Sequence, residues 1–438
     1  MNNFDITLTP TLENLIQRLE FTNENIFITG KAGTGKSTFI SYFRKITKKR
    51  VVYLAPTGVA AINIGGQTIH SFFKFRPDTT IDSIKRKSSF ESSFYTKLDM
   101  IIIDEVSMVR ADLLDMVDRF LRLNGKNPNI PFGGVQIIFL GDLHQLPPVV
   151  LPDERHMFTT RYESPYFFSA EVFALSTFSI IELTTVYRQT EEEFIDILNN
   201  IRSNTITDIQ LDILNKQFNP FYEDKAKDFF IYLTTTNDLA NKINEEQLSK
   251  LKTKGSILFG DIEGDFEKKS LPTEIVLSIK VGAQIMMINN DSLGRWVNGS
   301  IGKVIEIKKS KNSSSKIRVH LDTGEKWDIE PYTWKMNTYL LDMESGIIKT
   351  EPVGSFSQYP FRLAWAITIH KSQGKTFDHV IIDLGKGTFA HGQLYVALSR
   401  CKTLRGIILK QKVNRYHIQI DRRIIQFLKD SAAIYNTA

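Results

Sequence analysis

The sequence contains one cysteine among 438 residues, Cys401, so no disulfide can form within the chain. A lone cysteine is typical of proteins that work in a reducing compartment. The chain lacks any run of 18 apolar residues, which excludes a membrane-spanning helix of ordinary length. Its N-terminus has no basic patch followed by an apolar stretch, and acidic residues precede the first arginine. We therefore expect neither a secretory signal nor a mitochondrial presequence.

The sequence also has no internal repeats and no coiled-coil heptads, and its excess of positive over negative charge is small. The chain has 55 basic and 49 acidic residues and a net charge of +6, which permits a polyanionic partner without proving one. With 42% hydrophobic and 24% charged residues, the composition is that of an ordinary globular protein. At roughly 150 residues per domain, the length predicts two to four domains.

The most informative motif that is present is GKAGTGKS, at residues 30–37. Residues 25–29 before it predict a short buried strand, and the residues from Lys36 onward predict a helix. A glycine loop between a strand and a helix directs backbone N–H groups and the positive helix end at an anion. The motif therefore predicts a nucleoside triphosphate site in which Lys36 reaches the terminal phosphates and Ser37 binds Mg²⁺. The alternative is a chance glycine turn, which the full pattern in this context disfavours.

Further apolar runs at residues 51–56, 100–107 and 135–142 have the length and two-sided hydrophobicity of parallel strands covered by helices. An apolar stripe over residues 113–121 predicts a helix after the second of these runs. A second series of strands is expected at residues 178–183, 230–236, 379–384 and 406–410. The sequence thus predicts an α/β fold of two doubly wound parallel-sheet lobes with a ligand cleft between them.

Residues 284–350 break this alternation. Short alternating runs and a turn at residues 322–324 predict a small antiparallel barrel inserted in the second lobe. Residues 308–316 predict a solvated hairpin tip, with a nucleic-acid contact as the alternative, and residues 75–94 predict a mobile loop. We expect a first lobe with a small wedge insertion over residues 1–182, a second lobe over residues 183–283 and 351–438 that includes the C-terminal tail, and the barrel over residues 284–350.

Hydrolysis of a triphosphate needs a metal, a group that acts on water, and positive charge at the transition state. Asp104 and Glu105 end an apolar strand, so we expect Asp104 to hold Mg²⁺ through water and Glu105 to orient or deprotonate the attacking water. Gln145 follows the next strand and could sense the γ-phosphate. Arg188 and Arg400, from the second lobe, would close the cleft on the phosphates. The alternatives are helix caps for the acids and ordinary surface charges for the arginines.

The motifs follow one another in the order of a known family. They are GKAGTGKS at residues 30–37, APTGVAA at 55–61, GGQTIHSFF at 65–73, IIIDEVSMV at 101–109, GDLHQLPPV at 141–149, VYRQ at 186–189, TTTNDLANKIN at 234–244, AWAITIHKSQGKTFD at 364–378 and QLYVALSR at 393–400. This ordered set spans about residues 9–410. It resembles the superfamily 1 helicases of class B, a RecD-like branch, and within them the petite integration frequency (PIF) family of DNA helicases.

The resemblance implies an ATP-dependent helicase that moves 5′ to 3′ on single-stranded DNA and unwinds duplex, including duplex with a 5′ tail. It also implies RecA-like folds for the two lobes and an SH3-like fold for the inserted barrel. The substrates that it implies include G-quadruplex and DNA–RNA hybrid structures, and the roles are in replication, repair, recombination and telomere maintenance. Its ATPase residues correspond to Lys36, Ser37, Asp104, Glu105, Gln145, Arg188 and Arg400, with ATP and Mg²⁺ as cofactors. The nucleotide-binding positions are Gln17, Gly30, Ala32, Gly33, Thr34, Gly35, Lys36, Ser37, Thr38 and Gly374, although the sequence around Gln17 departs from the family pattern for an adenine-reading residue.

A protein that moves on single strands binds phosphates with hydroxyls and backbone N–H groups and stacks bases on aromatic rings. Candidates for these contacts occur in both lobes. They are Thr57, His70, Ser71, Phe72 and His144 in the first lobe and Thr234, Thr236, Asn237, His370, Lys371 and Ser372 in the second. For each of them, a helix cap or a satisfied core group is an equally good interpretation.

Two other functions are compatible with a phosphate loop, namely a nucleotide-dependent switch that clamps DNA and a phosphotransferase. The intact Lys36, Glu105 and both arginines favour the helicase. We expect a monomer on DNA, located inside the cell with the DNA, in a bacterial cytoplasm or nucleoid rather than a nucleus. The strand-separating wedge is expected in residues 65–77 or 150–173, and the second segment is favoured as the roomier insertion.

Overall fold

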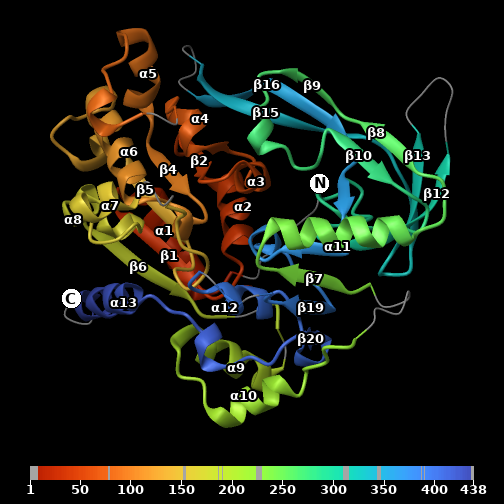
Figure 1. Cartoon of the computed structure of the whole chain (residues 1–438). Coiled ribbons are helices and arrows are strands. Elements are labelled where there is room, and N and C mark those ends of the chain that lie inside the picture. The colour runs from red at the N-terminus through yellow and green to blue at the C-terminus, as the bar shows by residue number, and fades with distance from the viewer. Residues whose placement is uncertain are drawn as a thin grey trace. The chain divides into compact units, whose positions relative to one another are not determined.

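The computed structural model describes residues 8–76, 79–150, 154–185, 187–189, 191–222, 229–308, 315–342, 347–385, 387–388 and 390–435. The chain divides into two compact units, whose elements Figure 1 labels and colours along the sequence. We call them the N-terminal unit, which contains Asn3–Val186, Met336–Val353 and Asp421–Ala438, and the C-terminal unit, which contains Tyr187–Lys335 and Gly354–Ile420. Each unit has its own parallel sheet.

The N-terminal unit is built on a six-stranded parallel sheet with the order β3-β2-β4-β5-β1-β6. Its strands are β1 (Asn25–Gly30), β2 (Val51–Ala55), β3 (Gln67–Thr68), β4 (Met100–Ile103), β5 (Gln136–Gly141) and β6 (Phe178–Leu183). Its helices are α1 (Pro10–Phe21), α2 (Lys36–Ile46), α3 (Gly58–Asn63), α4 (Ile69–Phe73), α5 (Ser89–Lys97), α6 (Ala111–Asn124), α7 (Arg155–Arg161), α8 (Glu171–Ala174) and α13 (Arg422–Tyr435). The order of the strands along the sheet defines a doubly wound fold.

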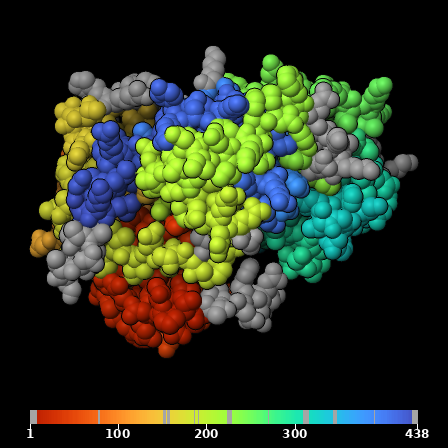
Figure 2. Space-filling model, turned by 90° about the horizontal axis from the view of Figure 1, so that it is seen from below, coloured from red at the N-terminus to blue at the C-terminus, as the bar shows by residue number. Residues whose placement is uncertain are grey.

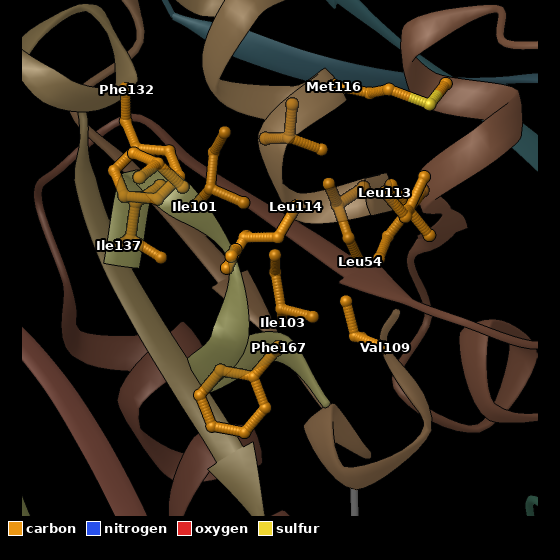
Figure 3. Close-up of a cluster of buried hydrophobic side chains, with 14 of the residues drawn as sticks. Leu54, Ile101, Ile103, Val109, Leu113, Leu114, Met116, Phe132, Ile137 and Phe167 are labelled. Atoms are coloured by element: carbon orange, nitrogen blue, oxygen red, sulfur yellow. The ribbon is translucent and has the colours of Figure 1, made fainter. Parts of the chain in front are cut away.

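Helices cover this sheet on both faces because its strands are apolar on both sides. On one face, α1 and α2 bury Leu15, Leu19 and Phe43 with the strands. On the other face, α6 buries the apolar stripe that its sequence predicts, and Figure 3 shows Leu114 of this helix beside Ile103 of β4. Full burial of such a side chain contributes about 2 kcal/mol. Helices packed on both faces therefore hold the strands in place, and with them the loops that follow the carboxyl ends of the strands.

The C-terminal unit contains a four-stranded parallel sheet with the order β18-β7-β19-β20. Its strands are β7 (Ile231–Thr234), β18 (Ala366–Thr368), β19 (Val380–Asp383) and β20 (Ile407–Leu409). The accompanying helices are α9 (Glu192–Ser203), α10 (Asp208–Asn215), α11 (Asn237–Lys250) and α12 (Gln393–Leu398). Figure 2 shows the outer surface of the segment with α9 and α10 in yellow-green. None of the helices in the described part of the chain is long and apolar enough to cross a membrane.

The remaining strands are antiparallel, and most of their residues belong to the C-terminal unit. A five-stranded sheet has the order β14-β13-β12-β11-β17, and smaller sheets have the orders β10-β8 and β15-β16-β9. The strands are β8 (Ser256–Phe259), β9 (Asp261–Gly264), β10 (Val276–Ile279), β11 (Gln284–Met287), β12 (Ile301–Lys308), β13 (Lys316–Leu321), β14 (Lys326–Ile329), β15 (Tyr332–Leu341), β16 (Ile348–Gln358) and β17 (Phe361–Leu363). The boundary between the two units falls within β15 and β16.

The structure confirms the predicted fold class, with two parallel sheets and antiparallel strands inserted in the second. The turn at residues 322–324 joins β13 to β14 as expected, and Ile317, Val319 and Leu321 are buried. The five-stranded sheet is consistent with the predicted insertion, and its closure into an SH3-like barrel stays a prediction. Residues 309–314 of the expected hairpin tip lie outside the described residues.

Two local predictions are wrong. Residues 178–183 do not open the second series of strands, because β6 pairs in parallel with β1 at the edge of the first sheet. Residues 75–94 are not simply a loop, because they contain a 3-10 turn at Ile81–Ser83 and the start of α5. The side chain of Ser88 accepts a hydrogen bond from the Glu91 amide and caps α5, so the serines of this segment begin a helix.

Candidate nucleotide and DNA sites

The predicted glycine loop joins β1 to α2 at the residues that the sequence indicates. Gly35 is the N-cap of α2 and has a left-handed backbone with φ of 81°. A Cβ atom at Gly30 would lie 2.6 Å from the Leu183 carbonyl oxygen. Both positions therefore require glycine. These glycines let the chain turn from β1 into α2, as a phosphate-binding loop of this pattern requires.

The ammonium group of Lys36 lies within this loop. Its Nζ donates to the carbonyl oxygens of Gly30, at 2.6 Å, and Lys31, at 3.1 Å. Thr34 is buried and donates from Oγ1 to the Lys31 carbonyl over 2.9 Å. Ser37 follows in the first turn of α2. The remaining loop positions predicted to bind nucleotide, Ala32, Gly33 and Thr38, belong to the same strand–loop–helix segment.

Asp104 and Glu105 follow β4 directly. Burial raises the pKa of the Asp104 carboxyl, whereas a hydrogen bond from the Glu105 amide, at 2.8 Å, and the positive charge of Lys36 act to lower it. Glu105 has a left-handed backbone with φ of 51°, which is rare for a residue with a side chain. Such strain is typical of functional sites. The structure thus brings Asp104 within the electrostatic reach of Lys36.

The end of β5 supplies the third part of this edge. Asp142 is buried and accepts hydrogen bonds from the His144 amide, at 3.1 Å, and from the Gln145 side chain, at 3.5 Å. The ring Nδ1 of His144 lies 3.6 Å from an Asp142 oxygen. Because parallel strands end at the same sheet edge, Gln145 and the glycine loop share one edge. Asp142 was not singled out from the sequence, although it comes just before the predicted His144 and Gln145 in the motif GDLHQ.

The two predicted arginines lie together in the C-terminal unit, on either side of Ser399. Arg188 donates to the Ser399 carbonyl over 3.3 Å, and Arg400 donates to the Ser399 hydroxyl over 2.8 Å. Arg400 is only 1% exposed, and its other donors reach the carbonyl oxygens of Val396, Ser372 and Lys375. The surface-charge alternative therefore does not hold for Arg400. Its contact with a phosphate stays a prediction.

Thr57 and Thr236 occupy equivalent places in the two parallel sheets. Each threonine is the N-cap of the helix that follows a strand, α3 after β2 and α11 after β7. The Thr57 hydroxyl accepts from the Ala60 amide and the Thr236 hydroxyl from the Leu239 amide, both at 3.3 Å. The helix-cap interpretation is therefore correct for both residues. A DNA contact by the same helix starts stays a prediction.

Three of the predicted DNA-binding residues have buried side chains. Thr234 and Ser372 are 0% exposed, and their hydroxyls donate to main-chain carbonyl oxygens of the C-terminal unit. Phe72 is 6% exposed and packs edge-on against Phe73 and Tyr339. These positions support the core alternative, because a stacking ring or a phosphate-binding hydroxyl must reach solvent. A DNA strand at these positions could be contacted only by main-chain atoms.

The other predicted positions are more accessible. The exposed residues among the predicted DNA-binding positions are His70, Asn237 and Lys371. Those among the predicted nucleotide-binding positions are Gln17 and Gly374.

Ser71 and His370 are half-buried, and burial lowers the pKa of the His370 imidazole. Gln17 lies in the middle of α1, on the side away from the buried Leu15 and Leu19. Its role as an adenine reader stays a prediction. Sequence reasoning missed Gln189, which is buried and donates to the carbonyl oxygens of Ser399 and Cys401.

The parallel sheet and the glycine loop define a P-loop nucleoside triphosphatase. A sequence profile of PIF1-like helicases matches residues 12–212, and one of the UvrD-like helicase C-terminal domain matches residues 363–408. The ATP-dependent DNA helicase Pif1 of Bdellovibrio bacteriovorus is 31% identical over 97% of this chain and 92% of its own length. The chain therefore belongs to the family of PIF1-like helicases, and it is an ATP-dependent DNA helicase.

Solved structures of the family agree with this assignment. The unliganded Pif1 from a Bacteroides species has a TM-score of 0.87 and 39% identity, with 97% of each chain covered. The complex of a Bacteroides Pif1 with ADP-AlF4 has a TM-score of 0.89 and 38% identity, with 98% of each chain covered. A Bacteroides Pif1 bound to single-stranded DNA has a TM-score of 0.71 and 40% identity, with 99% of each chain covered.

Proposed function

We propose that this helicase moves 5′ to 3′ along single-stranded DNA and separates the duplex ahead of it. The observation that supports the proposal is the shared sheet edge in the N-terminal unit, where the glycine loop with Lys36 follows β1, Asp104 follows β4 and Gln145 follows β5. A lysine, a carboxylate and an amide at one sheet edge are groups that ATP hydrolysis uses, and this supports the proposal. The direction of movement is supported by the family resemblance, because no residue type encodes polarity.

The predicted roles at this edge divide the work of hydrolysis. Lys36 binds the terminal phosphates, Glu105 orients the attacking water and accepts its proton, and Gln145 contacts the γ-phosphate. Arg188 and Arg400 of the C-terminal unit add positive charge to the phosphates when ATP is bound. Both side chains donate hydrogen bonds to Ser399, Arg188 to its carbonyl oxygen and Arg400 to its hydroxyl. A single movement of this segment could therefore shift both arginines together.

Mg²⁺ is the metal that we propose for this site. Ser37 offers a hydroxyl ligand, and Asp104 offers a carboxylate that would hold the ion through water, beside the phosphate oxygens that Mg²⁺ prefers. Burial raises the pKa of Asp104, and a bound cation would reverse that effect, so the residues fit the ion. Bound there, Mg²⁺ would neutralise charge on the phosphates. Among the described residues, no group of three or more His, Cys, Asp or Glu side chains could hold a metal by itself.

The proposed DNA substrates are single strands and duplexes with a 5′ single-stranded tail, with G-quadruplex and DNA–RNA hybrid structures as further substrates. One solved relative is described as bound to ssDNA, and another as unwinding forked dsDNA by two coordinating Pif1 helicases. We propose a monomer as the active species on a single strand. We also propose that the protein acts in replication, repair, recombination and telomere maintenance and that it is located with bacterial DNA.

The proposal is tested by strand displacement. Duplexes with a 5′ tail, a 3′ tail or no tail are mixed with the protein, ATP and Mg²⁺ under single-turnover conditions. The proposal expects release of the displaced strand from the 5′-tailed duplex at a rate at least about 10-fold above the other two. Faster release from the 3′-tailed duplex would contradict the direction of movement. A nucleotide-dependent switch would release no strand from any of the three.

A further inference from the structure

Two stretches of the C-terminal unit that are far apart in the sequence meet at the predicted arginines. One stretch contains Arg188 and Gln189 and leads to Glu191, the N-cap of α9. The other follows α12 directly and contains Ser399 and Arg400. Because α9 lies beside α12, the start of one helix and the end of the other bring these stretches together (Figure 1).

The side chain of Gln189 joins the two stretches. Its amide nitrogen donates hydrogen bonds to the Ser399 carbonyl oxygen over 3.0 Å and to the Cys401 carbonyl oxygen over 3.2 Å. A carbonyl oxygen can only accept, so both bonds require the amide nitrogen, and they use both of its N–H groups. Gln189 is 4% exposed. The two acceptors belong to the residues on either side of Arg400.

This bridge restricts the main chain of Arg400. The Ser399 carbonyl is part of the peptide group before Arg400. The carbonyl of Arg400 itself, in the peptide group after it, accepts a hydrogen bond from the Phe377 amide over 2.9 Å. With both peptide groups held, the Cα atom of Arg400 has a fixed position, and so does the direction in which its side chain leaves the main chain.

The guanidinium group of Arg400, in contrast, is held by bonds that a stronger acceptor can replace. Its acceptors include the carbonyl oxygens of Val396, Ser372 and Lys375 and the hydroxyl of Ser399. All four are neutral, and a hydrogen bond to a charged phosphate oxygen is about twice as strong as one to a neutral acceptor. A side chain that turns from these acceptors to a phosphate needs a main chain that stays in place.

Gln189 also fixes the relation between the two arginines. Arg188, its neighbour in the chain, donates from Nη1 to the same Ser399 carbonyl oxygen over 3.3 Å. Loss of the Gln189 amide would leave this longer bond as the contact of the segment with Ser399. The placement of both arginines therefore depends on one buried amide.

We propose that Gln189 is a positioning residue for Arg400 and acts on ATP hydrolysis through it. The inference rests on the proposed role of Arg400 in hydrolysis. A glutamate at this position would turn a charge toward two carbonyl oxygens, and an asparagine is one methylene shorter, so the chemistry of the bridge is specific to glutamine. Accurate placement matters because an error of about 1 Å in a catalytic group can cost about 10²-fold in rate.

The alternative is a tether that only stabilises the fold, and Glu191 provides a comparison for it. The Glu191 carboxylate accepts a hydrogen bond from the Leu404 amide over 2.9 Å. This contact ties the same segment to the same stretch of chain, but at a point beyond Arg400. A simple tether predicts that loss of either contact has the same effect on turnover.

The test measures kcat and KM for ATP with saturating oligothymidylate. Gln189→Met, which keeps the length of the side chain and removes its donors, is made in the wild type and in Arg400→Ala. Glu191→Ala is the matched control, and Gln189→Asn is a milder second variant that keeps an amide. Thermal unfolding of each protein shows that it is folded at the assay temperature.

The positioning role predicts that Gln189→Met lowers kcat about 10- to 10²-fold, with a change in KM of less than about 3-fold. In Arg400→Ala, the same substitution should have almost no further effect, because the residue through which it acts is absent. Gln189→Asn should show a smaller loss with the same dependence on Arg400. Glu191→Ala should leave kcat unchanged, although its melting temperature falls.

An unchanged kcat in folded Gln189→Met or Gln189→Asn would overturn the inference. An equal loss of kcat with and without Arg400 would also overturn it, and so would the same loss in Glu191→Ala, because a simple tether behaves in this way. Wild-type turnover in Arg400→Ala is a different result. It would contradict the proposed function of this arginine, and the positioning role with it.

Discussion

Nη1 of Arg400 donates a hydrogen bond to the main-chain oxygen of Lys375 over 3.3 Å. The arginine predicted to meet the phosphates of ATP therefore holds the backbone just after the 3-10 turn His370–Ser372, which carries predicted DNA-binding residues. Arg400 also donates to the Ser372 carbonyl over 3.4 Å, so it binds both ends of the segment 372–375. A change in the contacts of Arg400 would reach this segment directly, without any intervening residue.

The first prediction concerns Arg400→Ala. We expect ATP turnover with single-stranded DNA to fall about 10³-fold, because an arginine on the phosphates stabilises the transition state by about that factor. Nucleotide affinity should change far less. The folded protein should lose about 2 kcal/mol of stability, since the variant removes the hydrogen bonds of a buried guanidinium to the carbonyl oxygens of Val396, Ser372 and Lys375. Steady-state hydrolysis, nucleotide titration and urea unfolding measure the three effects.

Arg405→Ala is the control for this variant, because Arg405 is an exposed arginine a few residues along the same unit. It should leave turnover and stability unchanged. An unaltered turnover rate in a folded Arg400→Ala protein would remove this arginine from the catalytic residues.

The second prediction concerns Lys36→Ala. Its ammonium group lies in the glycine loop and meets the carbonyl oxygens of Gly30 and Lys31. Without it, we expect hydrolysis and unwinding to be lost while most of the single-strand affinity remains, because the predicted DNA contacts lie elsewhere. Lys45→Ala, at an exposed position of the same helix, is the matched control. Unwinding activity that survives in Lys36→Ala would rule out the assigned role.

The third prediction is a steep salt dependence of DNA binding. A protein that contacts several phosphates of a strand releases counterions, so log K should fall linearly with log salt, with a slope of about −0.7 for each contact on a single strand. Fluorescence anisotropy with an oligothymidylate gives this slope. A flat response would indicate a partner that is not nucleic acid.

The fourth prediction concerns pH and the ion pair between Arg50 and Asp99, at the starts of β2 and β4. Arg50 donates to Asp99 at 2.8 Å, and the net effect of its environment lowers the pKa of Asp99 to about 2. A carboxyl with a pKa below its unfolded value stabilises the protein at higher pH. Its contribution should be complete above about pH 5 and lost as the pH falls from about 4 to about 2.

We expect this contribution to be about 1 kcal/mol after allowance for solvent screening. Urea midpoints of the wild type and of Asp99→Asn, measured between about pH 2 and pH 7, isolate it. The two curves should converge at the acid end. A constant difference between them across the whole range would show that Asp99 acts through packing or neutral hydrogen bonds instead.

Much of the fold could be predicted because its determinants are local. The strand–loop–helix at Gly30 to Lys36 follows from apolar residues, glycines and spacing that lie next to one another in the sequence. The sheet to which residues 178–183 belong could not be predicted, because an apolar strand carries no mark of its partner. It pairs with β1, about 150 residues away. The helix α5 was missed because its serine-rich sequence is also typical of a loop.

The site could be predicted to the level of residue types and less well to the level of contacts. Motif order identifies Arg400, but its hydrogen bonds to Val396, Ser372 and Lys375 depend on how α12 packs. Phe72 resembles a stacking ring in sequence, and its burial becomes visible only with Tyr339, which lies 267 residues later. The pairing of Lys375 with Asn298 is a long-range contact of the same kind.

The central claim is that ATP hydrolysis at the glycine loop is coupled to a DNA strand. The most direct test is steady-state ATP turnover of the wild type and of Glu105→Gln, with and without saturating oligothymidylate. Coupling predicts that DNA raises wild-type turnover at least about 10-fold and that Glu105→Gln stays inactive under both conditions, because its neutral amide cannot accept the proton of water. Slow wild-type turnover that DNA does not change would contradict the claim and favour a nucleotide-dependent clamp.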